Sequence, residues 1–290
     1  MKQKNIALLL FLGILSSFLM ADDISAVWLE KQARWKETTY QFQRHAKLSN
    51  NKGYYQFSIV QTVPTDKSPA RASYLISEPS IWAGFSGLLE ALSFKVNGID
   101  LKNIDFEPEN FTEFKEEGLA GCSVKLDVDG TLLQLDWYMK DASPLLYGRI
   151  RHLDGEIQSL CMELSCGPSS YHFKPKGGVI FSGKYAREVV TPANSYKTST
   201  KRQQLKPEDN WLVYFDESIP QDRRYVGACL FCLEMPKTSK VELLLRDNWV
   251  AYTYVFLKPD FKEFEFSLWE SVTPHEQESV QGYAKTYWGK

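Results

Sequence analysis

The sequence lacks a second long hydrophobic run, a strong charge imbalance, an internal repeat and a low-complexity linker. Beyond its N-terminus no apolar run is long enough to span a membrane, so we expect no integral membrane segment in the mature chain. The 34 Lys and Arg nearly balance the 36 Asp and Glu, which does not indicate a nucleic-acid partner. What remains is a globular composition of 290 residues, in which 14% aromatics with eight Trp can build a substantial core.

The first 21 residues have the pattern of a secretory signal peptide. Lys2 and Lys4 form a basic start, residues 6–20 are apolar, and Ala21 is the predicted last residue before cleavage. We therefore expect a secreted or periplasmic protein with the mature chain Asp22–Lys290. Without the two lysines it has 32 basic and 36 acidic residues, a net charge of −4.

The five cysteines are an odd number, so at least one thiol lies outside an internal disulfide. Cys229 and Cys232 have the spacing of a metal or redox pair, but their segment alternates like a strand, in which residues three apart point to opposite faces. Cys161 and Cys166 meet the same objection. We predict small buried apolar residues rather than a site. A disulfide between different strands stays open.

An N-terminal helical segment is predicted over residues 22–50, with its helix running from Asp22 to about His45. Asp22 or Asp23 can cap this helix, and its apolar stripe consists of Ile24, Trp28, Trp35 and Phe42.

After Gly53 the sequence alternates with period two in short segments that turn residues separate. The predicted strands are YYQFSIVQTV, ASYLIS, ALSFKV, CSVKLDV, LLQLDWYM, LLYGRI, IQSLCMEL, GGVIFSG, WLVYF, YVGACLFCLE, KVELLLRD, WVAYTYVFL and FEFSLW. Such a run without interleaved helices predicts a mainly β fold, a large antiparallel two-sheet β-sandwich of the supersandwich kind with an N-terminal helix. We expect one domain over residues 51–290. The alternative is two smaller sandwiches that divide near Pro168.

Two dipeptides, Asn97–Gly98 and Asp129–Gly130, predict two-residue hairpin turns because each central position requires positive φ. The second turn sets one apolar and one polar face on its hairpin. The apolar pairs are Leu126 with Leu133, Val124 with Leu135 and Cys122 with Trp137, and the polar pairs are Lys125 with Gln134 and Ser123 with Asp136. The segment DVDG lacks the later ligands of a calcium loop, and the hairpin explains it. For the chain as a whole we predict no metal site and no cofactor.

A third hairpin is predicted near Asp154–Gly155, with a bulge that brings Ile150 opposite Leu160 and Leu146 opposite Leu164.

The run SPLLYGRIRHLDGEIQSLCMELSCGPS, together with the later WLVYFDE, resembles the large two-sheet sandwiches of galactose-mutarotase-like and related carbohydrate-active proteins of secreted bacterial type. The resemblance covers about the central half of the chain. It implies a broad concave sheet able to hold a sugar chain. Mutarotases use histidines with a catalytic carboxylate, and none of the four histidines aligns with that role: His45, His152, His172 and His275. The resemblance therefore supports the fold more than an activity.

The stretch WLVYFDESIP predicts a strand buried on both faces that ends in two carboxylates. Asp216 and Glu217 are adjacent and point oppositely while the strand lasts, so they cannot flank one bond as paired glycosidase carboxylates do. Two interpretations stay open. One is an ordinary cross-strand ion pair with Arg223 or Arg224, and the other is a single catalytic carboxylate at Asp216.

Positive charge gathers between residues 171 and 206, where eight basic residues face one acid, Glu188. They are Lys174, Lys176, Lys184, Arg187, Lys197, Lys201, Arg202 and Lys206. A basic loop on a β platform suits an anionic ligand such as a uronate-containing or sulfated glycan. The alternative is a solvated loop balanced by the acidic segment 100–129. Trp82 and Trp288 lie outside regular strand patterns and are the better candidates among the tryptophans for binding sugar, with packing as the favoured alternative even there.

Two classes of function follow. The first is a carbohydrate-binding or surface-associated protein, with a polysaccharide or cell-surface glycan as partner. The second is a carbohydrate-active enzyme, polysaccharide lyase-like or mutarotase-like. A lyase must neutralise a uronate and supply a base. The candidates for neutralisation are Arg187, Arg202 and Arg223, and those for the base are His172, Tyr185 and Tyr225.

Overall fold

The structure is a computed structural model of the whole chain. It describes residues 25–28, 34–35, 38–50, 53–62, 73–74, 89–101, 110–166, 171–173, 179–181, 188–215, 229–246, 251–270 and 277–288. The predicted signal peptide lies outside these residues, and the boundaries predicted for the segments 1–21, 22–50 and 51–290 stay predictions.

Nine strands form the larger sheet, and every neighbouring pair is antiparallel. In spatial order they are β16 (Ser195–Lys197), β15 (Glu188–Val190), β18 (Trp211–Phe215), β19 (Cys229–Leu233), β22 (Glu263–Glu270), β11 (Leu146–Asp154), β10 (Thr131–Lys140), β9 (Leu119–Val128) and β8 (Phe111–Glu116).

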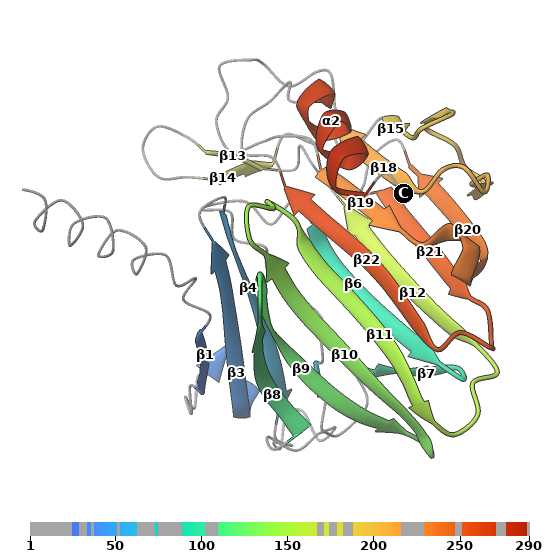
Figure 1. The fold of residues 1–290 in the computed structure, drawn as a ribbon. Helices are drawn as coiled ribbons and strands as arrows, with labels where there is room; N and C mark the ends of the chain where they lie inside the picture. The colour runs from blue at the N-terminus through green and yellow to red at the C-terminus, as the bar shows by residue number, and fades with distance from the viewer. Residues whose placement is uncertain are drawn as a thin grey trace, which may run out of the picture.

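A second antiparallel sheet of six strands faces the first (Figure 1). Its order is β17 (Gln203–Gln204), β20 (Thr238–Leu245), β21 (Ala251–Leu257), β12 (Leu160–Cys166), β6 (Leu89–Val96) and β7 (Ile99–Asp100). The predicted large two-sheet β-sandwich is confirmed. Strands from before and after residue 168 pair in both sheets, as β11 does with β22 and β12 with β21, so two sandwiches divided near Pro168 are not what is observed.

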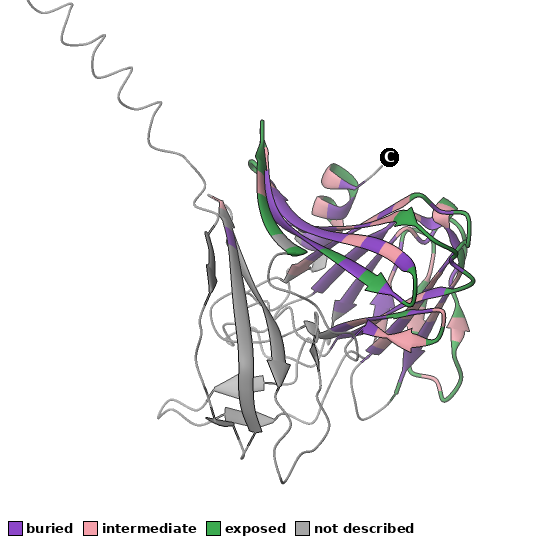
Figure 2. Cartoon of the chain, turned by 90° about the horizontal axis from the view of Figure 1, so that it is seen from below, coloured by how far each residue is buried: buried purple, intermediate pink, exposed green. Residues whose placement is uncertain are grey.

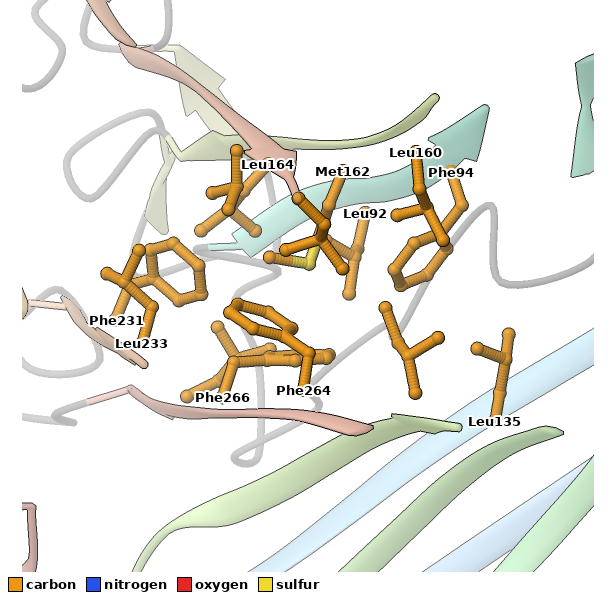
Figure 3. Packing of buried hydrophobic residues seen from close by; sticks show 14 of the residues in the cluster. Leu92, Phe94, Leu135, Leu160, Met162, Leu164, Phe231, Leu233, Phe264 and Phe266 are labelled. Carbon is orange, nitrogen blue, oxygen red and sulfur yellow. The ribbon is translucent and has the colours of Figure 1, made fainter. Parts of the chain in front are cut away.

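The main core fills the space between the two sheets (Figure 3). Leu92, Phe94 and Met162 of the six-stranded sheet face Phe231 and Phe266 of the nine-stranded sheet, and all five are almost completely buried. Each such side chain contributes about 1.5–3 kcal/mol by leaving water. Figure 2 shows buried residues along the strands of both sheets and exposed residues mainly at turns and strand ends.

The opposite face of the nine-stranded sheet carries a second core, which the C-terminal helix covers. Helix α2 (Gln277–Tyr287) contacts β18 and β19. Val280, Ala284 and Trp288 pack there on Tyr138, Leu145, Tyr147, Trp211, Val213, Leu230 and Cys232. β18 is therefore buried on both faces, as WLVYF predicts, with Leu212 and Tyr214 in the main core and Trp211 and Val213 beneath the helix.

The predicted N-terminal helix is wrong. Residues 22–50 contain β1 (Ser25–Trp28), β2 (Arg34–Trp35) and β3 (Thr38–Asn50), which form a sheet with β4 (Gly53–Thr62) and β5 (Ser73–Tyr74). β3 and β4 pair antiparallel from Asn50 and Gly53 outward. Helix propensity is a weak prior that such pairing overrides, and the β-branched Thr38 and Thr39 already favoured a strand.

The hairpin predictions divide into two confirmed and one wrong. Asn97 and Gly98 have φ of 50° and 83°, Asp129 and Gly130 have 50° and 79°, and both join antiparallel strands. The register across the second turn matches the predicted pairs, including Leu126 with Leu133 and Ser123 with Asp136.

The third hairpin does not form. At Asp154–Gly155 the chain crosses between sheets, so β11 pairs with β10 and β22 while β12 pairs with β6 and β21. Alternating apolar residues fit either a hairpin or two strands that face each other across a core, and the local pattern does not distinguish the two.

All five cysteines lie among the described residues, where Cys161 is half-buried and the other four are buried. Cys229 belongs to the main core and Cys232 to the core beneath α2, so they point to opposite faces of β19 as predicted.

Candidate functional site

A pocket of about 490 Å³ lies where the loop before β18, the turn after β19 and the end of α2 meet. Its lining residues are Pro207, Glu208, Asn210, Leu233, Glu234, Met235, Pro236, Lys237 and Trp288. The volume falls in the range of small-molecule sites, about 300–1,000 Å³.

Asp209 anchors the loop before β18 through hydrogen bonds. This carboxylate is fully buried and accepts hydrogen bonds from the hydroxyls of Thr191 (2.6 Å) and Tyr196 (2.7 Å), the amide of Asn194 (3.0 Å) and the backbone N–H of Lys206 (2.9 Å). Burial alone would raise the pKa of Asp209, but these hydrogen bonds outweigh it and the pKa lies below its ordinary value. The anchored Asp209 thereby holds its neighbours in the pocket wall.

The opposite wall is a one-turn 3₁₀ helix, η3 (Met235–Lys237), which directly follows β19. Pro236 in its first turn supplies the fixed φ that such a start needs. Glu234 forms an ion pair with Lys237 at 2.8 Å and accepts the backbone N–H of Glu265 at 2.8 Å. The carboxylate is thus held in one place in the lining of the pocket, with part of its surface exposed.

Trp288 closes the pocket on the side of the helix. It is 8% exposed, and its indole Nε1 donates a hydrogen bond to the carbonyl oxygen of Leu233 at 3.3 Å. Its backbone N–H donates to the carbonyl of Ala284 at 2.9 Å, which extends the helical hydrogen bonding to the end of α2. The ring is therefore a fixed wall of the pocket.

The pocket combines apolar walls with hydrogen-bonding groups of both kinds. Trp288, Met235 and Leu233 supply apolar surface. Glu208 and Glu234 supply acceptors, and Lys237 supplies donors. A ligand that presents hydroxyls beside C–H surface, as a sugar ring does, matches such walls, because each hydroxyl both donates and accepts.

Most residues predicted from the sequence as site residues lie outside the described part of the chain. These are Trp82, Lys174, Lys176, Lys184, Tyr185, Arg187, Asp216 and Tyr225, together with Glu217, Arg223 and Arg224. His172 lies on the short strand β13 (Tyr171–Phe173), which pairs with β14 (Val179–Phe181), and its side chain is not among the described ones.

The described cations of the basic segment do not line the Trp288 pocket. Lys197 is exposed on the edge strand β16, and Lys201 is exposed in the connection to β17. Arg202 lies over the ring of Tyr254, 3.8 Å from its centre, and pairs with Glu242 at 3.1 Å. These contacts place Arg202 against the outer face of the six-stranded sheet, away from the η3 wall.

The sequence pointed to Trp288 and missed the other pocket residues. Glu208 and Asn210 stand in KPEDN, and Glu234 and Lys237 in EMPK. Both segments put a proline turn and charged residues beside a buried strand. That signal could have marked both segments as loops, but nothing in the sequence showed that β18 and β19 bring them together.

No protein-family model and no curated protein matches the chain. Solved structures similar to it include a TPR-domain containing protein from Parabacteroides distasonis, with a TM-score of 0.44 and 9% identity over 79% of this chain and 47% of the other. An α-N-acetylgalactosaminidase from Bifidobacterium bifidum has a TM-score of 0.43 and 7% identity over 84% and 37%.

A Paenibacillus xanthan lyase has a TM-score of 0.42 and 10% identity over 92% of this chain and 27% of the other. Carbohydrate-active enzymes thus occur among the similar structures. The chain spans less than half the length of each of these three proteins.

Among the described residues, no helix has the length and hydropathy to cross a bilayer. Within the same residues, no cluster of three or more His, Cys, Asp or Glu side chains is arranged to hold a metal ion.

Proposed function

We propose that this is a carbohydrate-binding protein that holds a saccharide in the Trp288 pocket. The observation that carries the proposal is the pocket's construction. A fixed indole, a carboxylate held by two partners and a lysine converge on one cavity of about 490 Å³. Rigid polar groups against an apolar wall are what orient a polyhydroxylated ligand, since little conformational freedom is lost on binding.

Secretion belongs to the same proposal. The basic start, apolar stretch and Ala21 of the N-terminus support export, and an exported protein meets polysaccharide or cell-surface glycans.

The proposed glycan can be either anionic or neutral, and two parts of the chain favour different answers. The basic segment 171–206 favours an anionic glycan through Lys197, Lys201 and the cations that precede them. The pocket itself has two carboxylates, Glu208 and Glu234, against one lysine, and so favours a neutral sugar. Binding that weakens as salt rises assigns an anionic glycan to the basic segment, whereas salt-independent binding assigns a neutral one to the pocket.

An enzymatic role, lyase-like or mutarotase-like, is the alternative. Its candidate residues lie almost entirely outside the described residues, and a lyase would release an unsaturated sugar that absorbs in the ultraviolet.

The experiment is a thermal-shift and calorimetric screen of the mature chain against neutral, uronic and sulfated saccharides at low and moderate salt. A ligand that binds the folded state raises the unfolding temperature. We expect one class of saccharide to raise the unfolding temperature of the wild-type protein. Calorimetry of Trp288→Ala, carried out below the unfolding temperature of that variant, should show that it no longer binds this saccharide. The proposal fails when no saccharide of any class binds.

A further inference from the structure

The strand register of the nine-stranded sheet aligns polar residues in a row across its outer face. Ser123 on β9 lies opposite Asp136 on β10, Asp136 opposite Arg149 on β11, and Arg149 opposite Glu265 on β22. The row reaches Glu234 after β19, whose backbone N–H donates to the carbonyl of Glu265 at 3.3 Å. At the spacing of neighbouring strands, the row is about 19 Å long.

A second polar row runs beside the first. Lys125 lies opposite Gln134, Gln134 opposite Arg151, and Arg151 opposite Glu263. Lys125 is exposed, and the other three are half-buried. Helix α2 lies over β18 and β19, and no residue of the two polar rows belongs to the second core.

Asp136 holds the arginines of both rows in fixed orientations. Its side chain is fully buried. One oxygen accepts from the Ser123 hydroxyl (2.5 Å) and the Gln134 amide (2.8 Å), and the other from Arg149 Nε (2.9 Å) and Arg151 Nη2 (2.8 Å). The arginine side chains keep 25% and 35% of their surface exposed. Each guanidinium has five N–H groups, so donors remain after those that bind Asp136, although Nε of Arg151 is buried without a hydrogen-bond partner.

The acceptors of the rows are fixed in a similar way. The Tyr138 hydroxyl donates to Glu265 Oε1 at 2.6 Å, and the Tyr138 ring stacks on Tyr147 with 5.3 Å between centres. The backbone N–H of Glu265 donates to Glu234, which lines the Trp288 pocket. A continuous set of positioned donors and acceptors therefore leads from Arg151 to the pocket.

We propose that the two rows are an extended binding track for a neutral polysaccharide chain whose end unit occupies the Trp288 pocket. This inference rests on the proposed function of that pocket. An ordinary solvated sheet face does not need a buried carboxylate that orients two arginines, since exposed ion pairs contribute little to stability. Positioned polar groups along a line suit a ligand that repeats hydroxyls along a line.

The charges of the track favour a neutral chain over a polyanion. The track has four cations, Arg149, Arg151 and the flanking Lys125 and Lys140, and four carboxylates, those of Asp136, Glu234, Glu263 and Glu265. Each arginine has a glutamate opposite it on β22, Glu265 for Arg149 and Glu263 for Arg151, so an anionic chain would meet a repelling carboxylate beside each arginine. Hydroxyls can donate to the carboxylates and accept from the guanidiniums without a charge of their own.

The test is calorimetric titration of the mature chain with neutral oligosaccharides of one linkage, from the monosaccharide to the hexasaccharide. The series uses the sugar that binds best in the screen. We expect affinity to rise with chain length and to change little with salt. Arg151→Met and Glu263→Gln should lower the affinity for the hexasaccharide about tenfold, as loss of one charge-assisted hydrogen bond predicts, and leave the monosaccharide unchanged.

Lys240→Met is the matched control. Lys240 is also ion-paired, to Glu242 at 3.0 Å, and lies 4.5 Å from the centre of the Phe256 ring, but on the other sheet. Both test variants should fold. In Arg151→Met the carboxylate of Asp136 keeps its ion pair with Arg149, and in Glu263→Gln nothing bound to Asp136 is lost, because Glu263 makes no hydrogen bond to Asp136.

Equal affinity for the monosaccharide and the hexasaccharide would overturn the track while leaving the pocket. The track would also be overturned if Arg151→Met and Glu263→Gln bound the hexasaccharide as tightly as the Lys240→Met control does. Tighter binding of a uronate chain than of its neutral counterpart, weakened by salt, would overturn the neutral class. Absence of binding by every saccharide would instead remove the proposed function itself.

Discussion

The indole of Trp288 donates to the carbonyl of Leu233, 55 residues earlier in the chain, and this bond ties the end of α2 to the end of β19. Leu233 also donates its N–H to the carbonyl of Asn210 at 3.0 Å. One backbone position therefore joins the three segments that make the pocket. The integrity of the site and the docking of the helix depend on the same contact.

Trp288→Ala should destabilise the protein by about 3–5 kcal/mol, since it removes a buried aromatic side chain. Trp288→Phe keeps most of the apolar contact but leaves the Leu233 carbonyl without its donor, so we expect a loss of about 1 kcal/mol. Urea unfolding followed by circular dichroism measures both. Equal stability of wild type and Trp288→Ala would mean that α2 does not pack as described.

Asp136 should make stability depend on acid pH. Burial raises the pKa of Asp136, but hydrogen bonds from Ser123, Gln134 and Arg149 and the charge of Arg151 outweigh it, so the folded pKa lies below the ordinary 3.8. A lowered folded pKa contributes stability that is fully present above the unfolded pKa and is lost as pH falls through the folded one.

Asp136→Asn should therefore cost about 3 kcal/mol at neutral pH, the lower end for breaking a buried ion pair, because both arginines keep some water. The difference from wild type should shrink as pH falls below about 4. Unfolding free energies of the wild type and Asp136→Asn, measured from neutral pH to below pH 4, give this difference. A difference that stays constant with pH would show that the charge of Asp136 contributes nothing.

Asp209→Ala should loosen the loop before β18. The donors of Thr191, Asn194 and Tyr196 would lose their shared acceptor, at a cost of about 2 kcal/mol or more. Hydrogen exchange should quicken at the amides of Asn194 and Lys206. Asp209→Asn is the matched control and should show a smaller change, since it keeps one acceptor oxygen. Unchanged exchange in Asp209→Ala would contradict the anchoring role.

Thiol labelling should distinguish Cys161 from the other cysteines. Burial, then the charge of Glu163, raises the pKa of Cys161 to about 11, and its side chain is half-buried on the outer face of β12. At about pH 8 the thiolate is then about a thousandth of the total, so iodoacetamide should react slowly and faster as pH rises. The other four are fully buried and should react only on unfolding. Rapid labelling of Cys232 in the folded protein would contradict its place beneath α2.

The sequence was most informative where a local rule determines the structure. Asp129–Gly130 set a hairpin register that the structure reproduces pair by pair, because a two-residue turn and a one-sided apolar pattern each fix it. The burial of β18 on both faces followed from the apolar run of WLVYF in the same way.

The two failures have different causes. Residues 38–50 form a strand because the adjacent strand β4 pairs with them, and this pairing overrides the apolar spacing that suggested a helix. The crossing at Asp154–Gly155 depends instead on strands that follow a hundred residues later. The candidate site has the same character. The polar pair of Ser123 and Asp136 was visible from the hairpin, whereas its neighbours Arg149 and Glu265 and the assembly of the Trp288 pocket needed the whole sheet.

The most direct test of the saccharide pocket is fluorine NMR of the chain labelled with 5-fluorotryptophan, with the Trp288 resonance assigned by its absence in Trp288→Phe. We expect titration with the best neutral oligosaccharide to shift the Trp288 signal in a saturable way, while the signal of Trp137, buried between the two sheets, stays in place. A saccharide that binds by calorimetry yet leaves the Trp288 signal unmoved would contradict a saccharide site at Trp288.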